Sequence, residues 1–396
     1  MREYVQCVRK RGGKLFLIFI AAAFTVLELM SLYCSFKYRR TLQNYGCQTA
    51  SFLLPILFSL LLVISFVSFT SNILFYINPK AEEALTYFST VYICFVLYSF
   101  MLFIFADILS VVGGIINFSA PLYTICRRIY ANGLSVLIVS LALPIFGVLG
   151  ASHLAVTEYD IAIDKPASIH SLNAVMVSDI HVGPVIGESE LAVLKQKIAA
   201  LSPDVVFVCG DIVDHGSSWK LLRLSLEMLG GIKTKYGTYF VTGNHELYLD
   251  EFPKMLPMFA KYNVKVIDDT ALDLGGFIVA GRGDGGHKGE RIPLAEILSS
   301  SDRSKAVILL DHRPRDIEEA RAGGVDLEFS GHTHRGQIFP LNIIASLFNE
   351  ALYGHVKKGD YNLIVSSGVG VWNEFPVRIG SIGEIVSVRI KFGRGL

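Results

Sequence analysis

Four long apolar runs in the N-terminal part of this 396-residue chain limit what it can fold into. The runs lie at residues 15–34, 52–77, 88–116 and 134–152. Each is long enough for a helix that crosses a bilayer, which needs roughly 20 residues. Glu28 and Asp107 are the only charged residues in the runs, and no basic partner for them is visible there. We therefore predict an all-α transmembrane bundle of about four helices over residues 1–152.

The basic residues around these runs bear on the orientation of the bundle. Residues 1–150 carry eleven Lys and Arg against five Asp and Glu. With four spans, six basic residues flank the side that holds both ends of the bundle and five flank the other side. The first helix usually dominates, and the five basic residues before it favour a cytoplasmic N-terminus. We expect a multi-pass protein of the cell (inner) membrane with its second domain on the cytoplasmic side.

The remainder of the chain has a different composition. Residues 153–173 read as a linker with a first strand at 157–163, and residues 174–396 read as a separate domain. All ten histidines lie at or after His153, which places any imidazole chemistry in this part. The six cysteines form no CxxC pair and have no regular spacing, so neither a disulfide framework nor a cysteine zinc site is predicted.

Short apolar runs alternate with helical segments throughout the second domain. Strands are predicted at 174–178, 204–209, 238–242, 277–280, 306–310, 325–329, 363–365 and 384–391, and helices at 189–201, 219–229 and 252–262. This alternation predicts an α/β domain. In such domains the functional site lies at the C-terminal ends of the strands.

Polar residues follow five of these strands directly. The clusters are Asp179-x-His181, Gly210-Asp211-x-x-Asp214, Gly243-Asn244-His245-Glu246, Asp311-His312 and Gly331-His332-x-His334. Asp and Asn at strand ends often only cap a turn or a helix. Four of the five clusters contain histidine, however, which caps do not require. Carboxylate oxygens and imidazole nitrogens that converge on one point suit a divalent transition metal.

These blocks, in this order and spacing, resemble the signature of the calcineurin-like metallophosphoesterases over about residues 170–390. The resemblance implies a four-layer α/β/β/α sandwich and two divalent metal ions. By the same resemblance, the first ion would be held by Asp179, His181 and His334, the second by Asn244, His312 and His332, and Asp211 would bridge them. A shared anionic ligand also offsets the repulsion between two cations about 3.5–4 Å apart.

The roles of the remaining groups are less specific. His245 follows the ligand Asn244, so we expect it at the rim of the site as a general acid or charge stabiliser for the leaving group. The alternative is that His245 only packs or caps. Nitrogen and oxygen ligands without sulfur permit Mn, Fe, Zn, Co or Ni, and the resemblance favours Mn.

Other polar residues near the blocks remain open. Arg335, Arg378 and Arg313 are candidates for binding substrate phosphate through two hydrogen bonds each, although arginine is more often simply solvated. Asp214 and Glu246 either orient metal ligands or serve as surface and cap residues.

The run 331–340 resembles a bacterial subgroup of membrane-associated phosphodiesterases, some of which hydrolyse the pyrophosphate of UDP-2,3-diacylglucosamine. Arg335 departs from that subgroup, which usually has a small residue there. We expect a membrane-anchored dinuclear phosphoesterase that hydrolyses phosphodiester or pyrophosphate bonds, with membrane lipid and a lipid-linked substrate as partners. Nucleic acid is not expected, because the second domain is net acidic. The alternatives are a non-catalytic metal-binding membrane sensor or scaffold, and a transporter with a regulatory domain.

Overall fold

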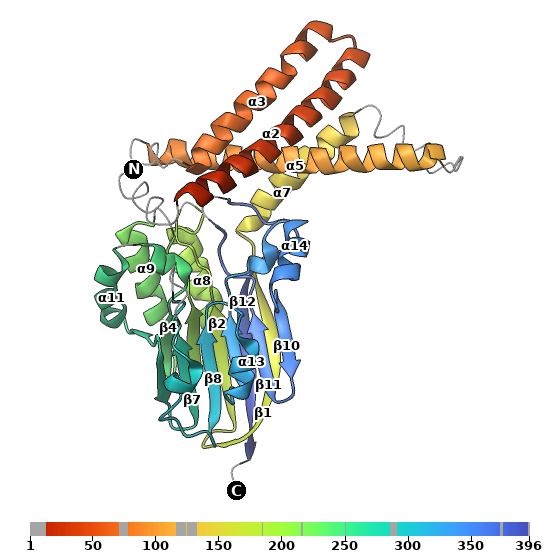
Figure 1. Cartoon of the computed structure of the whole chain (residues 1–396). Helices are drawn as coiled ribbons and strands as arrows, with labels where there is room; N and C mark the ends of the chain where they lie inside the picture. Colours follow the sequence, from red (N-terminus) through yellow and green to blue (C-terminus); the bar gives the residue numbers. More distant parts are fainter. Residues whose placement is uncertain are drawn as a thin grey trace. The chain divides into compact units, whose positions relative to one another are not determined.

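The computed structural model describes residues 13–70, 78–115, 124, 133–183, 185–214, 217–249, 251–285, 291–372 and 375–394 (Figure 1). The chain divides into two compact units. The first comprises Met1–Val148 with Glu374–Pro376, and the second comprises Leu149–Asn373 with Val377–Leu396. The described part of the first unit is helical, and the second unit contains the β-strands.

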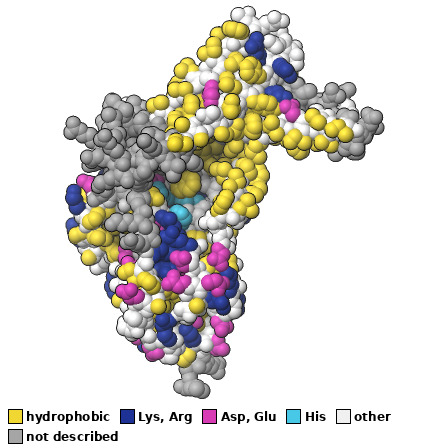
Figure 2. All heavy atoms as spheres, in the orientation of Figure 1, with side chains coloured by type: hydrophobic (Ala, Val, Ile, Leu, Met, Phe, Trp, Pro, Cys, Tyr) yellow, Lys and Arg dark blue, Asp and Glu magenta, His cyan; other side chains and the backbone are white. Residues whose placement is uncertain are grey.

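Four long helices account for most of the first unit. They are α2 (Gly13–Asn44), α3 (Gln48–Thr70), α5 (Pro79–Ile115) and α7 (Leu134–Ala151). Within the described residues, four helical stretches are long and apolar enough to cross a membrane: Ile20–Asn44, Ser51–Phe69, Lys80–Gly113 and Leu134–Ala151. Hydrophobic side chains cover much of the visible surface of these helices (Figure 2). The four predicted apolar helices are confirmed, while residues 71–77 of the second predicted run and residue 116 of the third lie outside the described residues.

The two acidic residues of the apolar runs have partners on neighbouring helices. Lys37 Nζ on α2 lies 2.5 Å from Asp107 Oδ1 on α5, and the Tyr33 hydroxyl donates to Asp107 Oδ2 at 2.5 Å. Glu28 on α2 accepts a 2.5 Å hydrogen bond from the hydroxyl of Ser59 on α3. Asp107 thus has a basic partner, Lys37, that was not visible within the apolar runs themselves. Lys37 lies past residue 34, where the first run was expected to end, but α2 continues through it to Asn44.

Replacing Lys37 with methionine should destabilise the helical unit, because Asp107 then keeps only Tyr33 of these two partners. A polar group left incompletely paired costs about 1–2 kcal/mol, so the thermal midpoint in detergent should fall by about 2–8 °C. The double variant Lys37→Met/Asp107→Leu should recover part of this loss. Lys80→Met, at an exposed position of α5, is the matched control. Equal losses in the Lys37 and Lys80 variants would contradict the pairing.

The second unit contains two six-stranded sheets among its described residues. The strand order of the first sheet is β1-β12-β2-β3-β4-β5 and that of the second is β10-β11-β9-β8-β7-β6. The first sheet is built from β1 (Leu154–Ala167), β12 (Gly383–Arg394), β2 (Ser171–Val177), β3 (Val205–Cys209), β4 (Gly237–Val241) and β5 (Val264–Val266). The second is built from β10 (Gly354–Lys358), β11 (Tyr361–Val365), β9 (Leu327–Ser330), β8 (Ala306–Asp311), β7 (Phe277–Arg282) and β6 (Thr270–Asp273). The central strands β2 to β5, and likewise β7, β8, β9 and β11, run parallel.

The two sheets pack face to face across the main hydrophobic core. Met176 and Phe207 of the first sheet meet Phe277, Ile308 and Phe329 of the second in one buried cluster. Helices α12 (Leu294–Ile297) and α13 (Ile317–Ala322) cover the other face of the second sheet. Helices α8 (Glu188–Ala200), α9 (Trp219–Gly230) and α11 (Phe252–Lys261) lie on the side of the first sheet (Figure 1). The predicted four-layer α/β/β/α sandwich is confirmed.

Several short elements are absent from the sequence-based prediction. They are β5, β6, β10, α12, α13, α10 (Asn244–Tyr248) and α14 (Leu341–Phe348). The segment expected to be a linker with a first strand forms all of β1 and the start of β2. Since β1 pairs with β12 from Leu154 onward, this segment belongs to the sheet itself.

Candidate metal centre

The five polar clusters meet at one edge of the sandwich, where the parallel strands end. Asp179 and His181 follow β2, Asp211 follows β3, and Asn244 begins α10 after β4. His312 follows β8, and His332 and His334 follow β9. Because the first three strands belong to one sheet and the last two to the other, the site lies across both sheets.

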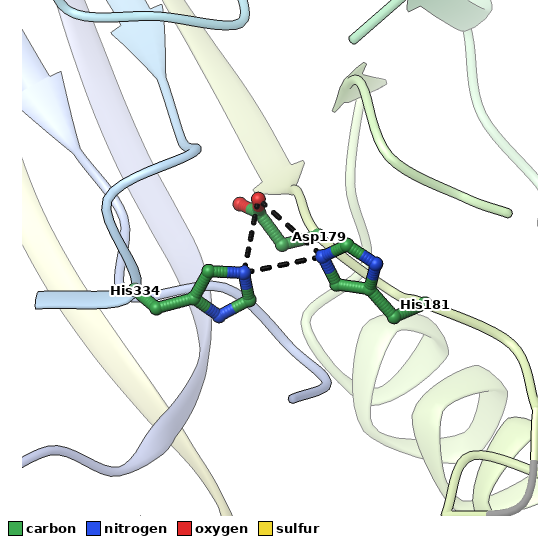
Figure 3. A group of neighbouring side chains, drawn as sticks. All are labelled: Asp179, His181 and His334. Atoms are coloured by element: carbon green, nitrogen blue, oxygen red, sulfur yellow. Dashed lines mark hydrogen bonds and ion pairs between the residues drawn. The ribbon is translucent and has the colours of Figure 1, made fainter. Parts of the chain in front are cut away.

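The first group consists of Asp179, His181 and His334, all buried (Figure 3). His181 Nε2 lies 3.1 Å from His334 Nε2. Asp179 Oδ1 lies 3.4 Å from His334 Nε2 and 3.9 Å from His181 Nε2. In Figure 3 the carboxylate and the two rings point toward one common place. These three residues are the set expected for the first metal.

The second group contains Asp211, which also lies near the first group. Asp211 Oδ2 lies 3.0 Å from His312 Nε2, and His312 Nε2 lies 3.2 Å from Asn244 Oδ1. The same oxygen of Asp211 lies 3.9 Å from His181 Nε2 in the first group. His332 completes a set of possible ligands with Asp211 and His312. Asp211 therefore stands between the two groups, as a bridging ligand must.

In two of the histidines, Nδ1 lies beside a protein oxygen and Nε2 is left as the candidate ligand atom. His312 Nδ1 lies 2.8 Å from the main-chain oxygen of Cys209, which can only accept, so this nitrogen carries the proton. His181 Nδ1 lies 3.2 Å from Asp214 Oδ2. In both rings Nε2 then faces the centre, which is the arrangement that carboxylate and carbonyl partners give to metal-bound histidines.

Asp214 also holds His245. His245 Nδ1 lies 2.6 Å from Asp214 Oδ1, and the main-chain N–H of His245 donates to Asp211 Oδ1 at 2.9 Å. The His245 side chain is 15% exposed, whereas those of His181, His312 and His334 are fully buried. A histidine at the surface of the site, oriented by a buried carboxylate, is suited to exchange a proton with a bound molecule.

Glu246 fixes the turn that carries Asp211. Its buried carboxylate accepts main-chain N–H bonds from Asp211 at 2.8 Å, Ile212 at 2.7 Å, Val213 at 3.2 Å and Gly243 at 2.9 Å. One side chain thereby satisfies four buried donors beside the bridging residue. Of the roles considered for Glu246, the orienting one and the helix-capping one both fit these contacts, because the bond from Gly243 also caps α10.

The backbone at the site adopts a conformation that side chains disfavour. Five of the seven predicted metal ligands have positive φ: Asp179 (51°), His181 (48°), Asp211 (56°), His332 (67°) and His334 (46°). Such strain gathers at functional sites, where packing imposes it. Two glycines permit the close approach of the clusters. A Cβ at Gly243 would lie 2.2 Å from Asp211 Oδ1, and one at Gly331 would lie 2.3 Å from Asp179 Oδ2.

Burial and mutual charge set the protonation of these groups. Burial alone would raise the pKa of Asp211, but His312, His245 and His181 lower it well below its usual range. Burial would lower the pKa of His312, but Asp211 and Asp179 raise it to about 10. Burial also lowers the pKa values of His332 and His334 well below the usual value, so both rings are neutral at pH 7.

This donor set fits divalent metal ions. Neutral imidazoles and ionised carboxylates are the protonation states that bind metals. The buried carboxylate of Asp211 attracts positive charge strongly enough to protonate the fully buried His312. A bound metal cation would supply the positive charge that the Asp211 carboxylate attracts. The predicted ligands contain no sulfur, so the set suits Mn, Fe, Zn, Co or Ni.

The three arginines considered for substrate differ in their surroundings. Arg378 is buried, and its terminal nitrogens donate to the main-chain oxygens of Ser367, Gly368, Gly370 and Ile382. Those contacts hold a turn, so the prediction that Arg378 binds substrate does not fit them.

The other two arginines lie closer to the surface. Arg313 pairs with Asp284, with 2.6 Å between Nε and Oδ2. Arg335 is half-buried and lies 4.4 Å from the ring centre of Tyr353, and its role in substrate binding stays a prediction. On the visible face of the molecule, Lys and Arg side chains lie beside exposed histidine side chains (Figure 2).

The turn held by Arg378 is the part of the site that sequence reasoning missed. Val369 N–H donates to Ser178 O at 2.9 Å and Gly370 N–H to Asp179 O at 2.8 Å. The turn therefore fixes the backbone that carries Asp179. Its glycine-rich composition after the strand at 363–365 was visible, but nothing in the sequence showed which loop it would contact.

Known proteins resemble both the site and the full length of the chain. Residues 172–336 match the family model described as Calcineurin-like phosphoesterase. An uncharacterized metallophosphoesterase of Campylobacter jejuni is 30% identical over 385 residues, which cover 95% of this chain and 99% of that protein. The chain belongs to the calcineurin-like metallophosphoesterase family. The four-layer sandwich and the ligand groups are thus those of a metallophosphoesterase.

In other relatives, the match with this chain covers a smaller share of the relative's length. A transmembrane protein with metallophosphoesterase domain from Bos taurus is 30% identical over 281 residues, 66% of this chain and 63% of that protein. The counterpart from Danio rerio is matched over 62% of its length. Among solved structures, a dimetal phosphatase from Danio rerio is similar to 50% of this chain and 88% of its own, with 14% identity and a TM-score of 0.34.

Replacing Glu246 with glutamine should weaken metal binding by about 10- to 100-fold, the usual cost of losing a group that orients a ligand. A glutamine side chain has one acceptor oxygen, and its NH₂ would face main-chain donors. Metal affinity is measured by titrating the purified protein with Mn²⁺. Glu190→Gln is the matched control, because Glu190 also accepts the N–H at the start of its helix, that of Gly187, but lies on α8. Unchanged affinity in the Glu246 variant would contradict its assigned role.

Proposed function

We propose that this metallophosphoesterase is a membrane-anchored, dinuclear metal-dependent phosphoesterase that hydrolyses phosphodiester or pyrophosphate bonds. The observation that carries the proposal is the position of Asp211 Oδ2, which faces His312 at 3.0 Å and His181 at 3.9 Å. One carboxylate oxygen shared by two ligand groups is the arrangement that two adjacent cations require. Mn is the metal we expect, with Fe, Zn, Co or Ni as alternatives.

The residues divide the chemistry between them. Asp179, His181 and His334 would hold one ion, Asn244, His312 and His332 the other, and Asp211 both. Bound there, two divalent ions would supply an activated water and neutralise charge on the phosphoryl oxygens. His245, oriented through Nδ1 by Asp214, would carry a proton at Nε2 and give it to the leaving oxygen. Asp214 also orients His181, so it serves both functions.

The membrane part of the proposal rests on the four apolar helices and on relatives named as transmembrane proteins. A catalytic domain attached to a bilayer meets substrates that are presented there. A lipid-linked diester or pyrophosphate, such as a UDP-diacylglucosamine, is therefore the substrate class we propose. We place the protein in the cell (inner) membrane with its catalytic domain on the cytoplasmic side, in contact with membrane lipid and without a nucleic-acid partner.

Hydrolysis of an aryl phosphodiester tests the proposal most directly. The purified full-length protein with Mn²⁺ should release nitrophenolate from bis-p-nitrophenyl phosphate, and chelation by EDTA should abolish the release. Asp211→Asn should reduce activity to background, because the bridging charge is lost. Asp273→Asn, at an exposed carboxylate that pairs with Lys305, is the control. Bound metal without hydrolysis of this diester, the matching monoester or lipid-linked diesters would favour the non-catalytic sensor.

A variant at His245 separates proton donation from metal binding. His245→Gln should slow the hydrolysis of alkyl esters by about 10²- to 10⁴-fold, since an alkoxide leaving group needs a proton. Nitrophenyl esters should be affected much less, because nitrophenolate leaves without one. The measurement compares kcat for both ester types at saturating Mn²⁺. Equal losses on both would show that His245 does not protonate the leaving group.

A further inference from the structure

Helix α14 exposes apolar side chains on a domain whose longer helices bury theirs. None of its residues is buried, and Leu347 and Phe348 are 76% and 82% exposed. The other large exposed apolar side chains of this helix are Leu341, Ile343 and Ile344. By contrast, α8, α9 and α11 each bury apolar residues. Contiguous exposed apolar surface of this kind marks an interaction site.

The segment around α14 is also uncharged. No Lys, Arg, Asp or Glu occurs between residues 336 and 349, although the second unit is otherwise rich in charge. A partner protein with a charged interface would find no complementary group here. An apolar phase is the partner that fits this composition best.

The residues before α14 are attached to the segment that leads into β12. The Phe339 N–H donates to the Ile379 oxygen at 2.7 Å, and Ile338 forms a bridge with Ile379. Residues 379–382 lead into β12, whose first residue, Gly383, pairs with Leu154 at the start of β1. Ile382 is itself 44% exposed. The base of α14 and the start of β1 therefore lie at the same edge of the sandwich.

The metal centre lies at that edge as well. Strand β2 runs antiparallel to β12, with Met176 opposite Val386, so the end of β2 that leads to Asp179 lies beside the start of β12. Glu384 N–H donates to Gly368 O at 3.0 Å, in the turn that holds the backbone of Asp179. Along the chain, His334 stands seven positions before α14 begins at Leu341. One edge thus carries the metal ligands, α14 and the first residue of β1.

The chain reaches this edge directly from an apolar helix. Helix α7, the last stretch that is able to cross a membrane, ends at Ala151, and β1 begins at Leu154. Three residue steps of extended chain span at most about 11 Å. If α7 crosses a bilayer, the first residue of β1, which lies at this edge, is held within this short reach of the end of that span.

We propose that α14 lies in the interfacial layer of the bilayer, with Leu347 and Phe348 inserted among the acyl chains below the headgroups. Apolar helical faces near a membrane take this position, about 5–10 Å into the headgroup and acyl boundary. The inference rests on the membrane part of the proposed function and not on hydrolysis. With α14 in this position, the metal-bearing edge faces the bilayer, so the substrate is a phosphate ester presented at a lipid surface.

Quenching of tryptophan by brominated lipid tests this position. Trp219 and Trp372 are replaced by phenylalanine in the full chain, and a single tryptophan is introduced as Phe348→Trp. The protein is reconstituted in phosphatidylcholine vesicles with bromine at a shallow or a deep position of the acyl chains. Phe146→Trp, 70% exposed on α7, reports on the membrane span. Ser304→Trp, exposed just before β8 and hence at the opposite edge from His312, is the negative control.

The tryptophan at 348 should lose most of its emission, and shallow bromines should quench it more than deep ones. The tryptophan at 146 should also be quenched, whereas the one at 304 should keep its emission. Quenching at 146 without quenching at 348 would overturn the α14 proposal and leave the membrane anchor intact. A blue-shifted, unquenched tryptophan at 348 would show that protein, either a second copy or the apolar helices of this chain, covers α14. Absence of quenching at both positions would overturn the membrane anchor as well.

Discussion

A single carboxylate oxygen connects the two halves of the metal centre. Asp211 Oδ2 faces His181 from the first sheet and His312 from the second. Its position depends on Glu246, which accepts the N–H groups of the turn after β3 and of Gly243. A buried carboxylate among histidines is stable only where each of its neighbours is oriented. The packing of the two sheets is therefore what makes one shared ligand possible.

The site also concentrates backbone strain. Left-handed φ values at Asp179, His181, Asp211, His332 and His334 each cost free energy, of the order of 1–3 kcal/mol for residues held in sparsely populated regions. The close-packed apolar core directly beneath, with Met176, Phe207 and Phe329 fully buried, offsets that cost. The chain thus places its least favourable backbone next to its most favourable packing. A rigid scaffold of this kind holds ligand atoms in place without relying on flexible loops.

In the helical unit, too, the two acidic groups of the apolar runs each have a polar partner. Asp107 is paired with Lys37 and Tyr33, and Glu28 with Ser59. Ionisable groups are costly among apolar helices unless a partner is near. In the second unit, α14 departs from the rule that apolar side chains are covered by protein. Its exposed apolar side chains belong to the edge that carries the metal ligands, and the chain enters this edge from the apolar helix α7.

The sequence by itself determined the classes of structure and the identity of the candidate ligands. Apolar runs of membrane-spanning length predicted four helices, and strand periodicity predicted an α/β domain, because both patterns reflect local burial. The Asp, His and Asn clusters predicted a metal site, and their resemblance to the calcineurin-like metallophosphoesterases implied which residues form each ligand group. Short elements such as β5, β6 and α12 were missed, since a few residues hold their conformation only through neighbouring strands and helices.

Tertiary structure decided the contacts between residues far apart in the chain. Lys37 meets Asp107 only because α2 extends beyond its apolar run and lies against α5. Arg378 was expected to face substrate, but folding directs it onto the main chain of the 367–370 turn. The dual role of Asp214 and the exposure of α14 are equally invisible in the sequence. Sequence determines which side chains prefer burial, charge or metal, but three-dimensional packing determines which of them meet.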